Sequence, residues 1–345
     1  SSDLRAAGLG ALLVASTTFA QDGPNLLDNP GFEDGLDGTW GVFGNAFLNQ
    51  EYSFEGINSL KMFGCFCGDY NGNGAYNLFT VPATPGQIYR VNAEMINPDF
   101  DSIAGTGSWG GMKVEFKNAK GRVIQLAEQR IIEGYDAGQE ENVWEAADFL
   151  CEAPEGATTI TAVPVFLQAS AGDAGAVWAD ALSVAESERD PANPVINGGF
   201  DLGVDYSYQL NYIFNGWSQQ YGNIFFDDAF YLSGPFSAGM FGNFPDYDGD
   251  GNCDPGGVSG MNQVIPGISE GDTVTLTFSA FTPSFDSING TQNFVFQIVE
   301  FFGDDPNNPI SSVNNTVMDG NGGFADDTWH EGSVTGIAPA GTTSA

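Results

Sequence analysis

An acidic segment near position 250 carries carboxylates at the spacing of a calcium-binding loop. Side-chain oxygens fall at positions one, three, five and nine of an EF-hand-like frame, with a glycine at the turn. The residues are Asp246, Asp248, Asp250 and Asp254, with Gly251 at the turn and Gly257 in place of the bidentate Glu of position twelve. We predict that this segment binds Ca²⁺, because four bare carboxylates would repel one another strongly. A solvated acidic turn is the alternative.

Aromatic residues in loops form the second group with chemical potential. A flat aromatic ring can stack on the apolar face of a sugar ring, while amides and carboxylates bind the hydroxyl groups. Trp109 is the leading candidate because it stands in a glycine-rich stretch, and Phe294 occupies the corresponding position later in the chain. Tyr70 and Tyr247 in the acidic loops are second choices. The other tryptophans, Trp40, Trp144, Trp178, Trp217 and Trp329, are predicted to pack in cores.

Catalytic motifs find little support in the sequence. Gly267–Gly271 matches the G-x-S-x-G string, but it precedes a predicted strand rather than joining a strand to a helix. His330 is the single histidine, which makes a Ser-His-Asp or Cys-His arrangement hard to build. We therefore expect no enzymatic activity in this chain.

The charge of the chain excludes two classes of partner. It carries 45 Asp and Glu against 9 Lys and Arg, a formal charge of −36, and no Lys or Arg follows Arg189. Such a chain cannot neutralise phosphate groups, so nucleic acid and anionic membrane surfaces are excluded as main partners. With 42% hydrophobic residues, the composition is that of a folded protein.

The first residues indicate a secretory signal. Arg5 precedes an apolar stretch, and small residues before Gln21 fit a signal-peptidase site, so we predict a signal peptide over residues 1–20 and a secreted, extracellular protein. In that setting the four cysteines become disulfide candidates, with three pairings open. A bridge between neighbouring Cys65 and Cys67 would be strained. We expect one of them to pair with Cys151, leaving Cys253 over.

The chain contains two copies of one sequence pattern. The matched segments are Asn29–Glu33 with Asn197–Asp201, Asp69–Gly74 with Asp246–Gly251, and Pro98–Ile103 with Pro283–Ile288. Order is preserved along the whole chain, which chance does not produce. The first acidic loop keeps a single carboxylate, Asp69, so any calcium site there should be much weaker.

Strand patterns dominate both copies. Tyr89–Met95 and Val274–Ala280 alternate apolar and polar residues in the same register, as half-buried strands do. Val123–Ile132 is compatible with either a helix or a strand. Short strands separated by Gly and Pro turns predict an all-β protein of two tandem β-sandwich (jelly-roll) domains.

We place the first domain at residues 21–185, a linker at 186–194 and the second domain at 195–345. The second copy stops at the position that corresponds to Ile160. We expect it to lack its last two strands, which would leave unpaired strand edges, and we expect the sequence to be part of a longer protein.

Three motifs of the first copy carry a resemblance to a known family. Asn25–Gly35 with Trp40, then Ala153–Thr158, then Gly175–Leu182 resemble the opening, penultimate and closing motifs of secreted carbohydrate-binding modules of families four, nine and twenty-two. These modules are galactose-binding-like jelly rolls. The resemblance covers nearly the whole mature chain, once per copy.

The resemblance implies a structural Ca²⁺ held by an acidic residue after the opening Phe and by an Asp of the last strand. Glu33 and Asp180 occupy those places in the first copy, and Asp201 occupies the first of them in the second. We therefore expect a non-catalytic, calcium-stabilised protein that binds a polysaccharide or other glycan. Two alternatives stay open: a matrix, adhesion or surface structural protein, and the accessory region of a glycoside hydrolase whose catalytic domain lies beyond residue 345.

Overall fold

The computed structural model describes residues 22–136, 139–200, 202, 214–221, 223–227, 229–232, 237–241 and 258–345. The predicted signal peptide, Asp201, Tyr247, Cys253 and the acidic segment 246–254 lie outside these residues. The described chain is all-β, with two short 3-10 turns, η1 (Asp99–Asp101) and η2 (Ser284–Asp286). No helix in this part of the chain has the length and apolar character needed to span a membrane.

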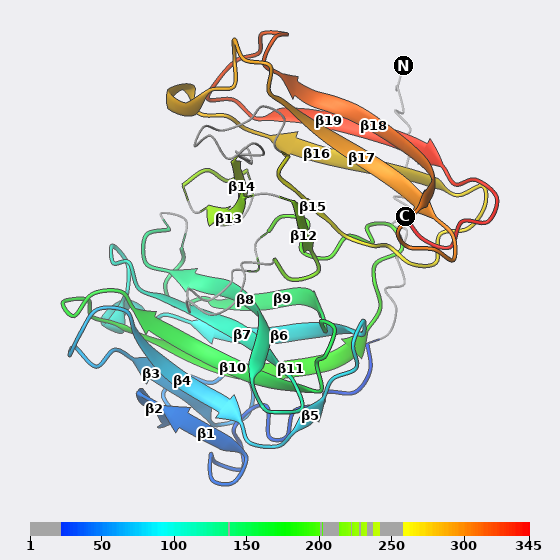
Figure 1. Ribbon diagram of the computed structural model, residues 1–345. Helices are drawn as coiled ribbons and strands as arrows, with labels where there is room; N and C mark the ends of the chain where they lie inside the picture. The colour runs from blue at the N-terminus through cyan, green and yellow to red at the C-terminus, as the bar shows by residue number, and fades with distance from the viewer. Residues whose placement is uncertain are drawn as a thin grey trace, which may run out of the picture.

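Residues 22–187 form an antiparallel β-sandwich, which we call the N-terminal sandwich (Figure 1, blue to green). One sheet has the order β1-β4-β10-β7-β8, with β5 paired to β10, and the other has the order β2-β3-β11-β6-β9. The strands are β1 (Trp40–Phe43), β2 (Asn45–Asn49), β3 (Ser59–Phe63), β4 (Asn71–Asn77), β5 (Val81–Pro82), β6 (Ile88–Ile96), β7 (Trp109–Lys117), β8 (Val123–Glu133), β9 (Trp144–Glu152), β10 (Thr159–Gln168) and β11 (Ala176–Ser187).

Alternation along each strand decides which side chains fill the space between the sheets. Met112, Val114 and Phe116 of β7 point inward, and Phe116 meets Tyr89 of β6 with ring centroids 6.4 Å apart. The predicted half-buried strands are confirmed. The ambiguous segment Val123–Ile132 is a strand, because β8 pairs with β7 along its length.

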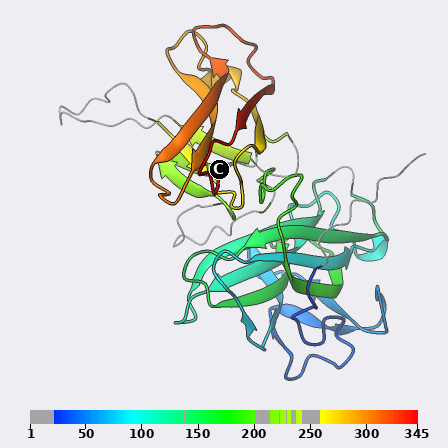
Figure 2. The ribbon, with the colours of Figure 1, turned by 90° about the vertical axis from the view of Figure 1, so that its right-hand side faces the viewer.

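The described residues between 194 and 345 form a second set of strands, which we call the C-terminal region. Its strands are β12 (Ser218–Tyr221), β13 (Asn223–Asp227), β14 (Ser237–Phe241), β15 (Gly260–Asn262), β16 (Thr273–Ala280), β17 (Phe294–Phe302), β18 (Pro309–Asp319) and β19 (His330–Ile337). Among the described residues they pair in twos, β12 with β15, β13 with β14, β16 with β19 and β17 with β18. The pair β16 and β19 and the pair β17 and β18 lie on one side of the N-terminal sandwich (Figure 1; Figure 2, orange and red).

The same opening turn appears in both parts of the chain. Asn29 and Asn197 both have a left-handed backbone, and the carbonyl of each accepts a hydrogen bond from a tryptophan indole, Trp40 Nε1 at 3.0 Å and Trp217 Nε1 at 3.2 Å. An asparagine tolerates this backbone region better than most residues. The repeated sequence therefore folds into a repeated local structure.

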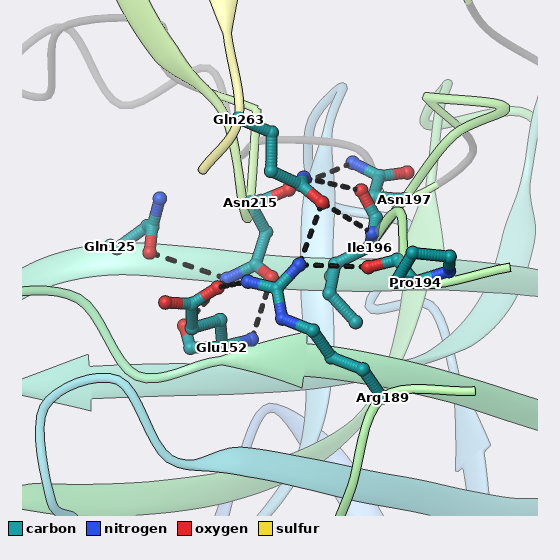
Figure 3. A network of polar contacts seen from close by, with 8 residues as sticks. All are labelled: Gln125, Glu152, Arg189, Pro194, Ile196, Asn197, Asn215 and Gln263. Atoms are coloured by element: carbon teal, nitrogen blue, oxygen red, sulfur yellow. Dashed lines mark hydrogen bonds and ion pairs between the residues drawn. The ribbon is translucent and has the colours of Figure 1, made fainter. Parts of the chain in front are cut away.

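A polar network joins the two parts (Figure 3). Asn215, which is fully buried, accepts a hydrogen bond from Glu152 N at 3.0 Å and donates to Glu152 O at 3.1 Å. Arg189 forms an ion pair with the Glu152 side chain and donates to Gln263 Oε1 at 2.9 Å and to Pro194 O at 2.8 Å. Burial raises the pKa of Glu152 and lowers the pKa of Arg189. The segment predicted as a linker thus takes part in a junction.

Candidate functional site

The outer face of the six-stranded sheet is the candidate binding surface. Because Met112, Val114 and Phe116 face the core, the intervening residues of β7 face outward. β10 pairs with β7 in unbroken register from Thr159 opposite Lys117 to Leu167 opposite Trp109. The outward residues of the two strands therefore form one continuous surface.

An apolar strip occupies one half of this surface. Trp109, Val163 and Val165 form a cluster against which Phe43 and Leu167 pack. The guanidinium of Arg130 lies 4.8 Å from the centre of the Trp109 ring, a cation–π contact that covers part of the indole.

Charged groups occupy the other half of the surface. Glu115 bridges two lysines, with Oε1 3.4 Å from Lys113 Nζ and Oε2 3.1 Å from Lys117 Nζ. Lys117 also donates to Thr161 Oγ1 at 2.8 Å. Carboxylate, ammonium and hydroxyl groups are the kinds of group that hydrogen-bond to a hydroxylated ligand. The face thus combines an apolar strip with an ordered polar row.

The C-terminal region carries the counterpart of this face on β17 and β18. Phe294, Phe296 and Ile298 point outward, because Val299 and Phe301 take the inward positions. The rings of Phe294 and Phe296 lie 5.7 Å apart and are 58% and 43% exposed. Opposite them on β18, Thr316 pairs with Phe296. The aromatic pair is therefore open to solvent beside hydroxyl and amide groups.

Trp109 is not the exposed loop aromatic that the sequence predicted. It is the first residue of β7 rather than a loop residue, and its side chain is 7% exposed in this structure. The reason is the neighbouring strand: β10 places Val163 and Val165 beside the indole, and Arg130 lies over it. Phe294, its counterpart on β17, is exposed.

The predicted aromatic Tyr70 lies at one end of the same sheet. It precedes β4, its amide donates to Ala169 O at 3.2 Å just after β10, and its side chain is 77% exposed. Tyr135, which the sequence analysis missed, is exposed at this end too, beside Gly107. The sequence could have indicated an exposed position, because Tyr135 directly follows Gly134 at the end of the segment that was compatible with either a helix or a strand.

The disulfide prediction is wrong. Cys65 pairs with Cys67 across a Cα–Cα distance of 5.2 Å, and Cys151 is a free, fully buried cysteine. Phe66 adopts a left-handed backbone with φ of 56°, which allows the short loop to close. Cys151 points from β9 into the sandwich core, whereas Cys65 lies in a loop after β3. Burial strongly raises the pKa of the Cys151 thiol.

The two carboxylates that the family resemblance implied both accept hydrogen bonds from the backbone of one loop. Glu33 Oε1 accepts hydrogen bonds from the amides of Ile57 and Asn58, both at 2.8 Å. Asp180 Oδ2 accepts from the amides of Phe54 at 2.8 Å and Glu55 at 3.1 Å. The predicted residues are thus brought to one place, residues 54–58.

A third carboxylate, Glu55, converges on the same place and was missed by the sequence analysis. A Cβ built on Gly31 would lie 3.3 Å from Glu55 Oε1 and 3.5 Å from Asp180 Oδ1, so both oxygens face one small space beside this glycine. Burial is the main cause that raises the pKa of Asp180, and the charge of Glu55 adds to it. Such hard oxygen donors suit Ca²⁺.

Other observations limit the metal prediction. Among the described residues, no group of three or more His, Cys, Asp or Glu side chains is arranged as a metal centre. Asn71 and Asn73, expected in a weaker acidic loop, belong to strand β4, and Asn73 Oδ1 accepts a hydrogen bond from Asn45 N at 2.8 Å. This loop frame is therefore part of the sheet.

The G-x-S-x-G string is a turn, as predicted. Gly267 and Gly271 have positive φ angles of 80° and 90°, and the amide of Ser269 donates to Asp272 Oδ2 at 2.8 Å. The segment leads into strand β16. Nothing in this geometry resembles a nucleophile between a strand and a helix.

No family model matches the chain, and no curated protein matches it. Among solved structures, an arabinose-bound GH51 α-L-arabinofuranosidase matches with 18% identity and a TM-score of 0.35, over 51% of this chain and 28% of that one. The chain therefore spans about a quarter of that enzyme.

Two carbohydrate-binding structures match over most of their own length. The tandem CBM22-1–CBM22-2 domain of Xyn10C from Paenibacillus barcinonensis has 15% identity and a TM-score of 0.33, over 96% of this chain and 89% of that one. The TmCBM61 complex with β-1,4-galactotriose has 18% identity and a TM-score of 0.30, over 48% of this chain and 99% of that one. At these TM-scores the comparisons assign neither a family nor a ligand to this chain.

Proposed function

We propose that this chain is a secreted, non-catalytic protein that binds a polysaccharide or other glycan through the outer faces of its larger sheets. The observation that carries the proposal is the exposed pair Phe294 and Phe296 on β17, beside Thr316 and Asn314 of β18. Aromatic rings offer a flat apolar surface to the C–H face of a pyranose, and hydroxyl and amide groups can bind its hydroxyls.

The outer face of the N-terminal sandwich supports the same chemistry in a more covered form. Tyr76 of β4 lies over Gly41 of β1 at its margin, where a side chain on Gly41 would clash with the tyrosine ring. The row of Lys113, Glu115 and Lys117 lies on the same face. We assign this face as the second glycan surface, with Tyr76 as its accessible aromatic.

The proposal also includes secretion of the protein and calcium binding. The Cys65–Cys67 disulfide is typical of an oxidising compartment, in line with the predicted signal peptide over residues 1–20. Glu33, Glu55 and Asp180 are the residues that would hold Ca²⁺ in the N-terminal sandwich, where its charge would offset their mutual repulsion. The acidic segment 246–254 is the proposed second site.

Affinity gel electrophoresis on a panel of neutral and acidic polysaccharides tests the proposal. The double variant Phe294→Ala/Phe296→Ala should lose about tenfold in affinity, or about 1.4 kcal/mol, for a glycan that retards the wild type. Phe285→Ala is the matched control, because Phe285 is also exposed but packs near Phe230. Neutral glycans should bind better than uronates, which a protein of charge −36 repels. Equal retardation of both variants would exclude the aromatic pair as the platform.

A surface-adhesion role is the second candidate. It is favoured by aromatic rings on the outer face of the other sheet, where Phe100 stacks on Tyr52 at 5.9 Å and both Phe100 and Phe47 are exposed. Exposed apolar patches of this kind mark contact surfaces. Sedimentation velocity with and without calcium separates the roles: assembly lost in Phe47→Ala/Phe100→Ala, with no glycan retarding the wild type, would favour adhesion.

A further inference from the structure

An exposed aromatic cluster in the C-terminal region plays no part in either proposed function. Phe281 is its central ring, with centroids 5.1 Å from Phe230 and 5.3 Å from Trp329. Phe285 lies 6.1 Å from Phe230 and is 79% exposed, while the other three side chains are half-buried. Phe281 directly follows β16 and Trp329 directly precedes β19, so this C-terminal aromatic cluster is separate from the aromatic pair on β17.

The N-terminal sandwich has a counterpart of this cluster. Tyr52 holds the place of Phe230 in the repeat, and the carbonyl of each accepts a hydrogen bond from the serine that begins the next strand. Phe100 holds the place of Phe285, and the two lie in the 3-10 turns η1 and η2. Trp178 of β11 is the central ring here, 5.5 Å from Tyr52 and 6.1 Å from Phe100.

The N-terminal cluster is occupied by an ammonium group of the same chain. Lys61 Nζ lies 4.2 Å from the centre of the Trp178 ring and 3.2 Å from Asp101 Oδ2. The negative face of an aromatic ring attracts an ammonium group, and the neighbouring carboxylate adds to this attraction. Asp101 directly follows Phe100 in η1, so one turn presents both a ring and a counter-ion. This cluster is therefore an ammonium site that is filled from within the chain.

The C-terminal aromatic cluster has no ammonium group of its own. The third residue of β3 is Lys61, and the third residue of the matching strand β14 is Gly239, which has no side chain to reach the cluster. Asp286, the counterpart of Asp101, is present, exposed and without an ion pair among the described residues. No Lys or Arg follows Arg189 in the sequence. The rings and the counter-ion are thus repeated, whereas the cation is not.

We propose that the C-terminal aromatic cluster binds an alkylammonium group from outside the chain, with Asp286 as the counter-ion. Phe281 is the central ring of this site, as Trp178 is in the N-terminal sandwich. The ligand has the chemistry of the Lys61 side chain, which a free aliphatic amine or a lysine of another polypeptide can supply. The formal charge of −36 attracts either cation to the protein.

Titration of the full chain with n-butylammonium, followed by nuclear magnetic resonance, tests the site. The indole N–H signal of Trp329 should shift and saturate at about 0.15 M salt, where a Debye length of about 8 Å screens diffuse attraction. The neutral analogue n-butanol should cause no such shift. Phe281→Leu and Asp286→Asn should each weaken binding by about threefold, in the range of an exposed cation–π contact. Asp304→Asn removes another exposed carboxylate and should leave the affinity unchanged.

The N-terminal sandwich allows a gain-of-binding test. Lys61→Ala removes the ammonium group from the face of Trp178 and leaves Asp101 without this partner. The indole N–H signal of Trp178 should therefore respond to n-butylammonium in the variant and not in the wild type. A Trp178 signal that ignores the amine in a folded Lys61→Ala chain would overturn the comparison on which the proposal rests.

A short peptide with one lysine and blocked ends distinguishes the two sources of the cation. Binding several times tighter than that of n-butylammonium would assign the site to a lysine of another polypeptide. Equal or weaker binding of the peptide would assign it to a free amine. Equal responses of Trp329 to n-butylammonium and n-butanol, or no response to either cation, would overturn the proposal.

Discussion

The two halves of the chain share one sequence pattern but differ in how completely they close. The N-terminal sandwich has two continuous sheets around a large core that extends from Leu27 to Val184, and Leu202 of the C-terminal region packs in the same cluster. The β16–β19 layers enclose a core of four buried residues, Val299, Phe301, Val334 and Ala338. The difference follows from β10 and β11, the inner strands that the second copy lacks among the described residues.

This comparison shows that the closing strands of such a sandwich do more than enlarge its two sheets. Each inner strand satisfies two edges at once and brings apolar side chains to the middle of the core. The same absence changes the candidate binding faces. Val163 and Val165 of β10 cover Trp109, whereas Phe294 has no such neighbour in the described part of the chain and is exposed.

The largest expected effect comes from equivalent core substitutions. Phe116→Ala and Phe301→Ala each remove a fully buried ring at about 3–5 kcal/mol. The N-terminal sandwich should keep a cooperative transition at a lower melting temperature, whereas the C-terminal region should lose its transition altogether. Differential scanning calorimetry measures both, and equal losses in the two variants would break the comparison.

The second-largest expected effect is that calcium stabilises the two halves to different extents. A ligand at a hundred times its Kd adds about 2.7 kcal/mol to the state it binds. If Glu33, Glu55 and Asp180 hold the ion, millimolar Ca²⁺ should raise the melting temperature of the N-terminal sandwich. The variant Asp180→Asn should remove that gain. Asp99→Asn, at an exposed site, is the control. A rise in the melting temperature of the C-terminal region alone would place the calcium site in segment 246–254. No rise in either melting temperature would contradict calcium binding.

A smaller effect is expected at the junction of Figure 3. Asn215→Ala leaves the amide of Glu152 and the side chain of Gln125 without their partner, at a cost of about 1–3 kcal/mol. In calorimetry, the melting temperature of the C-terminal region should fall, and the two transitions should lie further apart. Asn193→Ala, an exposed position in the same segment of chain, should leave both unchanged. Coincident shifts of both transitions would show that the halves unfold as one unit.

The smallest effect is a pH dependence of opposite sign in the two halves. Burial raises the pKa of Glu133 and Glu145, so their contribution to stability is full below the ordinary carboxyl pKa and is lost as pH rises through the native value. Backbone hydrogen bonds lower the pKa of Asp305 and Asp327, whose contribution is present above the ordinary pKa and lost as pH falls through the native value.

Melting curves in chelator between about pH 3 and 7 should show this opposition. Acidification should first favour the N-terminal transition and later weaken the C-terminal one. Glu133→Gln should reduce the acid-side gain of the N-terminal sandwich, and Glu270→Gln, which alters an exposed carboxylate, should not. Parallel shifts of both transitions would contradict the assignment.

Much of the fold was predictable because it depends on local pattern. The alternation in Tyr89–Met95 decides which side chains of β6 can face a core, and the repeated Asn and Trp of the opening motif form the same turn twice. Comparison of the copies also predicted which strands correspond to each other, since order along a repeat is readable without coordinates. These features are determined by neighbours close in sequence or by the repeat itself.

The candidate site needed the tertiary structure because its neighbours are distant in sequence. Trp109 is covered by Val163 and Val165, more than fifty residues away along the chain, and Glu55 meets Asp180 only where the loop 54–58 crosses the bulge of β11. Cysteine spacing did not reveal that Cys151 is unpaired. Its side chain points from β9 into the core, away from the loop that holds Cys65. Residue type and periodicity set which face a side chain takes, but strand order alone decides what covers it.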